Sequence, residues 1–229
     1  MKTINNVATL TNVNGVGVIA INFPPVNALS ASVRDGIHGA MQAAIADPAI
    51  DAVVLRCEGS TFIAGADITE FGKPPAGVSL GEVQRILEES PKPVVAAIHG
   101  TALGGGLEVA LVCHYRIAVP TARLGLPEVN IGLLPGAGGT QRLPRIVGPE
   151  AALEMMTSGA HVRAKDALQS GLLDELAPED DLTGAAVALA RRVVDEKRPL
   201  RKIREQNEKV EAARGQPEIC AKFRQANAK

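Results

Sequence analysis

The most constraining feature of this sequence is residues 93–112, where nearly every side chain is apolar or absent. Pro93–Ile98 is a short apolar run rich in Val and Ala, which favours a buried strand. The glycines Gly104–Gly106 follow, and Leu107–Val112 is apolar on every side apart from Glu108. A helix that is apolar all round has to be buried. The remaining elements must therefore enclose this segment.

Predicted strands and helices alternate around it. Strands are predicted at Val16–Asn22, Ala52–Arg56, Pro93–Ile98 and Tyr115–Val119, and helices from the N-cap Ser30 to Asp47, at Leu80–Glu89 and after the glycines. This order predicts an α/β domain with largely parallel strands. From about residue 149 the pattern becomes helical, at 149–158, 163–170 and 181–196, with Leu172–Leu176 as a strand candidate.

Composition narrows the class of protein. The 229 residues suit one large domain, or a domain with a small helical appendage. Aromatic residues make up only 2%, with no Trp, and the net charge is −1, so neither a nucleic acid nor a membrane is expected as a partner. Three cysteines without a CxxC pair argue against a disulfide scaffold. The N-terminus lacks an apolar signal segment, and a cytoplasmic location is expected.

The glycine-rich turn can take part in chemistry. Glycines between a strand and a helix let the backbone approach a ligand, and the first amides of a helix have no intrahelical acceptor. Such amides can stabilise an oxyanion. A tight turn without a ligand is the alternative. Glu108 stands in the first turn of this helix, where a buried acid is costly unless it is partnered or functional. Its alternative role is to complement the helix dipole.

A second acid, Glu128, precedes an unusually apolar loop, which suggests the wall of a pocket. Two carboxylates near one reacting centre can divide the roles of acid and base. The alternative is a structural glutamate that binds local amides. The loop 62–68 combines small residues with Asp67, so the Ala66 amide can face a ligand. Alternatively this loop is a simple turn in which Asp67 caps the next segment.

Other signals are weaker. Residues 136–140 resemble a phosphate-binding loop but lack the lysine of a Walker motif. The four histidines have no metal-ligand spacing, so no metal site is expected. The basic residues after Glu196 are interpreted as a solvated helix face.

Five segments carry a resemblance to a known family: Pro25–Leu29, Phe62–Ile68, Pro93–Gly100, Leu103–Glu108 and Leu126–Leu143. Their order and spacing resemble the enoyl-CoA hydratase/isomerase (crotonase) family over roughly residues 10–195. Two stretches, Leu103–Arg116 and Gly125–Gly148, look closest to the hydratase part of multifunctional β-oxidation enzymes.

The resemblance implies an α/β fold: a ClpP-like spiral of ββα turns with two near-perpendicular sheets and surrounding helices. It implies a crotonase core at residues 1–197 and a helical tail at 198–229 that is shorter than in the family. Fused relatives continue into a dehydrogenase, but no GxGxxG segment is present here. A trimer-based homo-oligomer or contact with a dehydrogenase domain is the protein partnership that the resemblance implies.

The resemblance also implies site residues. Ala66 and Gly105 match the oxyanion-hole positions, and Glu108 and Glu128 match the catalytic acids. The residues implied to bind the acyl-CoA substrate are Asn27, Ala28, Leu29, Ala64, Asp67, Ile68, Pro127 and Gly136. No cofactor is expected, because coenzyme A is part of the substrate. Thr69 stands where the family often has a basic residue.

The implied activity is that of a lyase, a 2-enoyl-CoA hydratase of fatty-acid metabolism (β-oxidation). A Δ3,Δ2-enoyl-CoA isomerase on the same scaffold is the nearest alternative. A non-catalytic subunit that binds acyl-CoA is the third.

Overall fold

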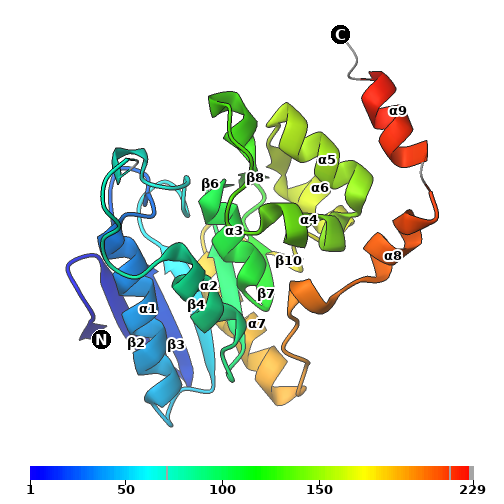
Figure 1. Ribbon diagram of the computed structural model, residues 1–229. Helices are drawn as coiled ribbons and strands as arrows, with labels where there is room; N and C mark the ends of the chain where they lie inside the picture. Colours follow the sequence, from blue (N-terminus) through cyan, green and yellow to red (C-terminus); the bar gives the residue numbers. More distant parts are fainter. Residues whose placement is uncertain (71, 217, 227–229) are drawn as a thin grey trace.

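A mixed sheet of seven strands forms the centre of the computed structural model, which describes residues 1–70, 72–216 and 218–226 (Figure 1). The strands lie in the order β1-β2-β3-β4-β5-β7-β10. Their bounds are β1 Lys2–Thr3, β2 Ala8–Val13, β3 Val16–Ile21, β4 Ala52–Cys57, β5 Val94–Ile98, β7 Tyr115–Ala118 and β10 Glu175–Leu176. From β3 to β10 all neighbours are parallel, whereas β1 and β2 pair antiparallel.

A second sheet is small and lies near the glycine-rich turn. It contains β6 (Thr101–Leu103), β8 (Arg123–Gly125) and β9 (Val162–Arg163), with β6 parallel to β8. The loop after β4 continues this sheet. Ile63 forms an isolated parallel bridge with Ala102, and the Ile63 carbonyl accepts a hydrogen bond of 3.1 Å from the Leu103 N–H. The loop 62–66 is therefore held beside β6.

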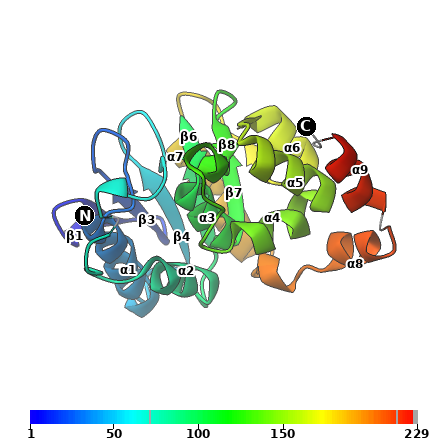
Figure 2. The same cartoon turned by 45° about the horizontal axis from the view of Figure 1, so that its top comes forward.

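The helices are α1 Ala31–Ala46, α2 Leu80–Glu88, α3 Gly105–Val112, α4 Gly139–Val147, α5 Pro149–Ser158, α6 Ala164–Ser170, α7 Leu182–Asp195, α8 Glu208–Arg214 and α9 Glu218–Ala226, with short 3-10 turns at η1 Ile68–Glu70, η2 Pro127–Ile131 and η3 Ile203–Glu205. The expected cap holds: the Ser30 side chain accepts from the Val33 N–H at the start of α1. In both views α8 and α9 lie on the side of α4–α6 away from α1 (Figures 1 and 2).

The middle of the central sheet is buried on both faces, because β3, β4 and β5 are apolar at every position except Arg56 near the end of β4. In β4, Val53 and Leu55 face the core that contains α1, α2 and α3, whereas Ala52 and Val54 face α7. Side chains of a strand alternate between faces, so this arrangement needs continuous apolar runs. Figure 2 shows α1, α2 and α3 in front of the sheet.

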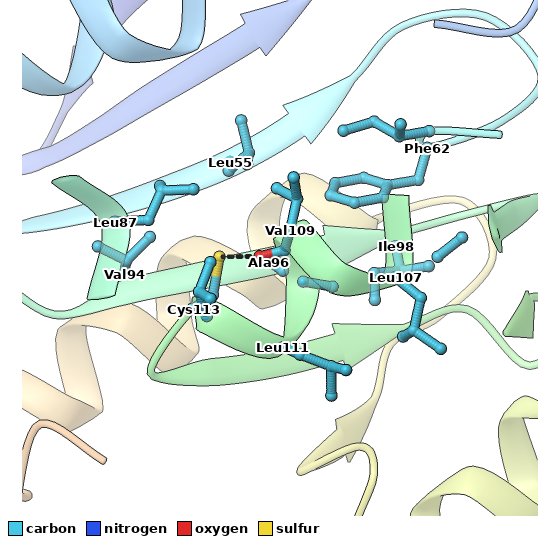
Figure 3. Close-up of a cluster of buried hydrophobic side chains, with 14 of the residues drawn as sticks. Leu55, Phe62, Leu87, Val94, Ala96, Ile98, Leu107, Val109, Leu111 and Cys113 are labelled. Atoms are coloured by element: carbon cyan, nitrogen blue, oxygen red, sulfur yellow. Dashed lines mark hydrogen bonds between the residues drawn. The ribbon is translucent and has the colours of Figure 1, made fainter. Parts of the chain in front are cut away.

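Helix α3 is the most enclosed element. All eight of its residues are buried, which confirms the expectation drawn from its sequence. In Figure 3, Leu107, Val109 and Leu111 leave α3 in different directions, and the apolar side chains around the helix come from the sheet, from α2 and from the loop after β4, which contains Phe62. Burial on all sides fixes the position of the helix, and with it the glycine-rich turn at its N-terminus.

The helices predicted at 149–158, 163–170 and 181–196, and the four predicted strands, are confirmed within one or two residues at each end. The strands β6, β8 and β9 were not predicted, because two or three residues are too few to show a period. Helix α4 was not predicted either, since it begins with a glycine and contains Pro144. The predicted parallel arrangement is confirmed for β3 to β10. At the other edge of the sheet, β1 and β2 pair antiparallel, and this edge was not predicted.

Gly106 is required where α3 passes the loop 62–66. A Cβ atom at Gly106 would lie 2.1 Å from the Ile63 carbonyl oxygen, which is a backbone atom and cannot rotate away. We expect Gly106→Ala to lower the free energy of unfolding by roughly 3 kcal/mol, the upper part of the usual range for overpacking. Denaturant titration measures this loss.

The matched control is Gly81→Ala in α2, where the nearest neighbour of a Cβ, Ser79 Oγ, would be 3.9 Å away. The same substitution there should stabilise the protein by about 0.5–1 kcal/mol, as alanine does in helices. Equal effects of the two substitutions would contradict the close approach at Gly106.

Candidate functional site

A cavity of about 960 Å³ opens at the N-terminus of α3. Its walls come from five segments: the loop after β4, helix α2, the start of α3, η2 and the turn before α4. Eight of the residues singled out in the sequence line it: Ala64, Ala66, Ile68, Gly105, Glu108, Pro127, Glu128 and Gly136. The fold therefore brings together residues that lie up to 72 positions apart, from 64 to 136.

Two backbone amides face this cavity from different elements. Gly105 is the first residue of α3, and its N-cap Gly104 has a φ of 52°, which favours glycine. A Cβ at Gly105 would lie only 3.7 Å from the Ala66 nitrogen, so the two segments are adjacent. In the part of the chain that the structure describes, neither the Ala66 nor the Gly105 N–H has a hydrogen-bond acceptor. Two such donors can bind one oxygen atom.

Glu108 is buried, and its carboxylate is held by the turn before α4. Its Oε1 atom accepts hydrogen bonds of 2.8 Å from the N–H groups of Ala137 and Gly139. Burial raises the pKa of Glu108, and these two amides oppose that rise, as does the charge of Arg142. The carboxylate is therefore oriented by hydrogen bonds that favour its ionised form.

Glu128 lies across the turn from Glu108. A Cβ at Gly104 would be 3.2 Å from its Oε1 atom, so this carboxyl group lies against the glycine-rich turn. Its Oε2 atom is buried and has no hydrogen-bond partner among the described residues. Burial raises the pKa of Glu128, a hydrogen bond from its own backbone N–H opposes that rise, and the charge of Glu108 raises the pKa further. Burial thus raises the pKa of both acids, but Glu108 is held by two amides of the turn, whereas Glu128 keeps one buried oxygen without a partner among the described residues.

Four residues from the resemblance, Asn27, Ala28, Leu29 and Asp67, do not line the cavity. Asn27 is buried and holds the backbone together, since its amide donates to the Glu58 and Thr61 carbonyls at 2.9 Å.

The other three lie beside the loop 62–66 or just after it. The Leu29 N–H donates to the Gly65 carbonyl at 2.9 Å, and the Ala28 carbonyl accepts from the Ser30 N–H. Asp67 accepts hydrogen bonds from the Thr69 N–H and hydroxyl, which lower its pKa. These hydrogen bonds agree with the alternative role of Asp67, in which it caps the segment that follows it. Substrate contacts from all four residues stay predictions.

Sequence reasoning missed several residues of the cavity. Gln84 and Arg142 line it from α2 and α4, and the side chains of Ile131, Leu133 and Leu134 line its apolar part. Gln84 left one usable signal, a polar side chain beside Val83 and Leu87 on the buried face of α2. Ile131, Leu133 and Leu134 belong to the apolar loop after Glu128 that suggested a pocket wall, although none of the three was named as a site residue.

The two cysteines at positions 57 and 113 are free thiols in the core, and burial raises the pKa of Cys113 to about 12. Within residues 1–70, 72–216 and 218–226, no cluster of His, Cys, Asp and Glu could hold a metal ion. Among the same residues, no helix is long and apolar enough to cross a membrane.

Comparison with known proteins identifies the family. The family described as enoyl-CoA hydratase/isomerase matches residues 11–222, which is most of the chain. The chain therefore belongs to the enoyl-CoA hydratase/isomerase family. A "Peroxisomal bifunctional enzyme" of Danio rerio is 53% identical over 165 residues, covering 72% of this chain and 23% of the relative. A "Probable enoyl-CoA hydratase" of Bacillus subtilis is 46% identical over 165 residues, covering 69% of this chain and 64% of the relative.

Solved structures agree with the expected fold class. Pseudomonas aeruginosa DspI matches with a TM-score of 0.76 and 32% identity over 98% of this chain and 97% of that one. An enoyl-CoA hydratase from Bacillus anthracis matches with a TM-score of 0.74 and 32% identity, covering 81% of this chain and 76% of that one. The crotonase-type α/β fold is thereby confirmed. The chain spans about a quarter of the length of the bifunctional relatives it matches.

The Oε2 atom of Glu128 is buried without a partner among the described residues, so we expect the ionised form of this side chain to lower the stability of the fold. Because its pKa is raised in the folded state, the folded chain holds this proton more tightly than the unfolded chain does. Stability from this group is complete below the unfolded pKa, near 4.3, and is lost as the pH rises through the folded pKa. Glu128→Gln should therefore raise the free energy of unfolding by about 1 kcal/mol at pH 7, and the gain should shrink toward pH 4.

The measurement is a series of denaturant titrations between pH 4 and pH 8. Glu154→Gln, an exposed change on α5, is the control and should have no effect at either end. If Glu128→Gln stabilised the protein equally at every pH, the raised pKa of Glu128 in the folded state would be contradicted.

Proposed function

We propose that this chain is a 2-enoyl-CoA hydratase, a lyase that adds water across the C2–C3 double bond to give a 3-hydroxyacyl-CoA in fatty-acid β-oxidation. The observation that carries the proposal is the meeting of two carboxyl groups and two free backbone amides at one cavity. The printed names of the relatives support it, since they include an enoyl-CoA hydratase and β-oxidation multifunctional proteins.

The Ala66 and Gly105 amides supply the electrostatic part of the mechanism. A thioester carbonyl oxygen bound between them becomes more negative as an enolate develops, and fixed donors stabilise that charge. Polarising the carbonyl also draws electrons from Cβ, which makes Cβ electrophilic. The N-terminus of α3 adds the positive end of its dipole at Gly105.

The two acids divide the proton transfers. Glu108 is oriented by two amides whose hydrogen bonds favour its ionised form, so it accepts a proton from the water that attacks Cβ. Glu128 has an unpartnered, buried oxygen and a raised pKa, so it delivers the proton to Cα. The product gains a hydroxyl group at Cβ and a hydrogen at Cα, and the next turnover needs the proton to pass back to Glu128.

A second activity has one observation in its favour. Glu128 alone, with its free oxygen in the cavity, can take a proton from one carbon of a 3-enoyl-CoA and return it to another. Such Δ3,Δ2-isomerisation needs the amides and Glu128 but not Glu108. We propose it as a secondary activity of the same site.

The proposal includes no cofactor, because each step uses groups of the chain and of the substrate. A cytoplasmic location, a homo-oligomer and contact with a dehydrogenase domain stay proposals as well. The bifunctional names of several relatives favour the last of these.

Glu108→Gln separates the two activities. We expect kcat for hydration of crotonyl-CoA to fall by about 10²–10⁴-fold, the usual loss when a general base is removed. Isomerisation of a 3-enoyl-CoA should fall by less than about tenfold. Hydration is followed by the loss of absorbance of the conjugated thioester, and Glu154→Gln again serves as the control with unchanged rates.

If kcat for crotonyl-CoA hydration were the same in Glu108→Gln as in the wild type, the two-acid mechanism would be refuted. A wild-type chain that binds a CoA ester in calorimetry without turning over either substrate would instead identify a non-catalytic acyl-CoA-binding subunit.

A further inference from the structure

The buried face of α2 carries two polar residues where apolar ones are usual. Gln84 and Glu88 are 7% and 2% exposed, lie one turn apart, and directly follow the buried Val83 and Leu87. Residues four apart share one face of a helix. This face is turned toward the segment 137–142, which contains the amides that hold Glu108.

Gln84 contacts that segment directly. Its Nε2 atom donates a hydrogen bond of 2.7 Å to the Ala137 carbonyl and a longer one of 3.3 Å to the Glu108 carbonyl. A single amide group thus joins the residue that bears the acid to the turn that orients it. The N–H of the same Ala137 donates to the Glu108 carboxylate at 2.8 Å. Both the carbonyl and the N–H group of Ala137 are therefore hydrogen-bonded.

Glu88 supports the other end of the turn. It forms two hydrogen bonds of 3.1 Å with Arg142, whose Nη1 atom also lies 3.4 Å from the Ala137 carbonyl. The Arg142 guanidinium also packs against the turn 137–139, since a Cβ atom at Gly138 would clash with its Nη1 atom. Without Gln84, the Ala137 carbonyl would keep only this long contact among the residues that the structure describes.

We propose that Gln84 is a positioning residue for Glu108: it fixes the turn 137–139 so that the two amides of this turn orient the carboxylate. The inference rests on the proposed function, in which Glu108 acts as the base. Gln84 needs no contact with the reacting atoms for this role. Groups that orient a functional residue commonly contribute 10–100-fold to activity.

The test is Gln84→Met, which keeps the volume and removes the donor. We expect kcat for crotonyl-CoA hydration to fall by about 10–100-fold, whereas KM should change by less than about threefold, because the thioester is bound by other groups. The acid limb of the kcat–pH profile should move to higher pH, since weaker amide contacts stabilise the ionised carboxylate less. Gln42→Met on the exposed face of α1 is the matched control and should change none of these.

A purely structural role would lower the melting temperature and leave both kcat and the acid limb where they are, and this result would overturn the inference. Inactive wild-type protein would count against the proposed function instead. In that case the carboxyl ¹³C chemical shift of Glu108, titrated in the wild type and in Gln84→Met, decides the inference: an unchanged pKa contradicts it.

Should Gln84→Met fail to fold, Gln84→Glu takes its place. A carboxyl group can donate to the Ala137 carbonyl only while it is protonated. The rate of this variant relative to wild type should therefore rise as the pH falls. A ratio that does not change with pH would overturn the inference.

Discussion

The site depends on the close approach between the N-terminus of α3 and the loop 62–66. Gly106 has no side chain, so the helix can pass the Ile63 carbonyl at a distance that any Cβ would block. The same contact brings the Ala66 nitrogen beside Gly105. Because all of α3 is buried, the helix cannot move away to relieve strain there. Two free amides from distant parts of the chain are thus held at fixed positions before any substrate arrives.

The same helix organises the acids. It carries Glu108 into a wall of apolar side chains, where an ionised carboxylate is stable only with hydrogen bonds. Ala137 and Gly139 provide them, and Gln84 binds the turn from behind. Glu128, in contrast, stands on a short 3-10 turn and keeps a buried oxygen without a partner. This difference in environment, more than the presence of two glutamates, is what allows them different roles.

Much of this could be predicted from the sequence. The apolar residues of α3 predicted its burial, the apolar runs of β4 and β5 predicted buried strands, and the alternation of strands with helices predicted a largely parallel sheet. The resemblance supplied Ala66, Gly105 and the two acids, all of which line one cavity. The roles of these residues stay predictions until they are measured.

Other parts could not be predicted, for physical reasons. Strands of two or three residues, such as β6 and β8, exist only because neighbouring segments supply hydrogen bonds, and they leave no periodic pattern. The support of Glu108 by Ala137 comes from backbone atoms, which carry no sequence signal. Asn27 binds the backbone just before the loop 62–66 and Leu29 binds the loop itself, roles that a motif cannot distinguish from contact with a ligand.

The most direct test of this account is a crystal structure of the chain with a bound acyl-CoA. We expect the thioester oxygen to lie about 3 Å from both the Ala66 and the Gly105 nitrogens, the distance required of oxyanion donors. We also expect the carboxyl groups of Glu108 and Glu128 to lie beside Cβ and Cα on one side of the acyl chain. A thioester bound elsewhere in the cavity, or one that meets only a single amide, would contradict the account.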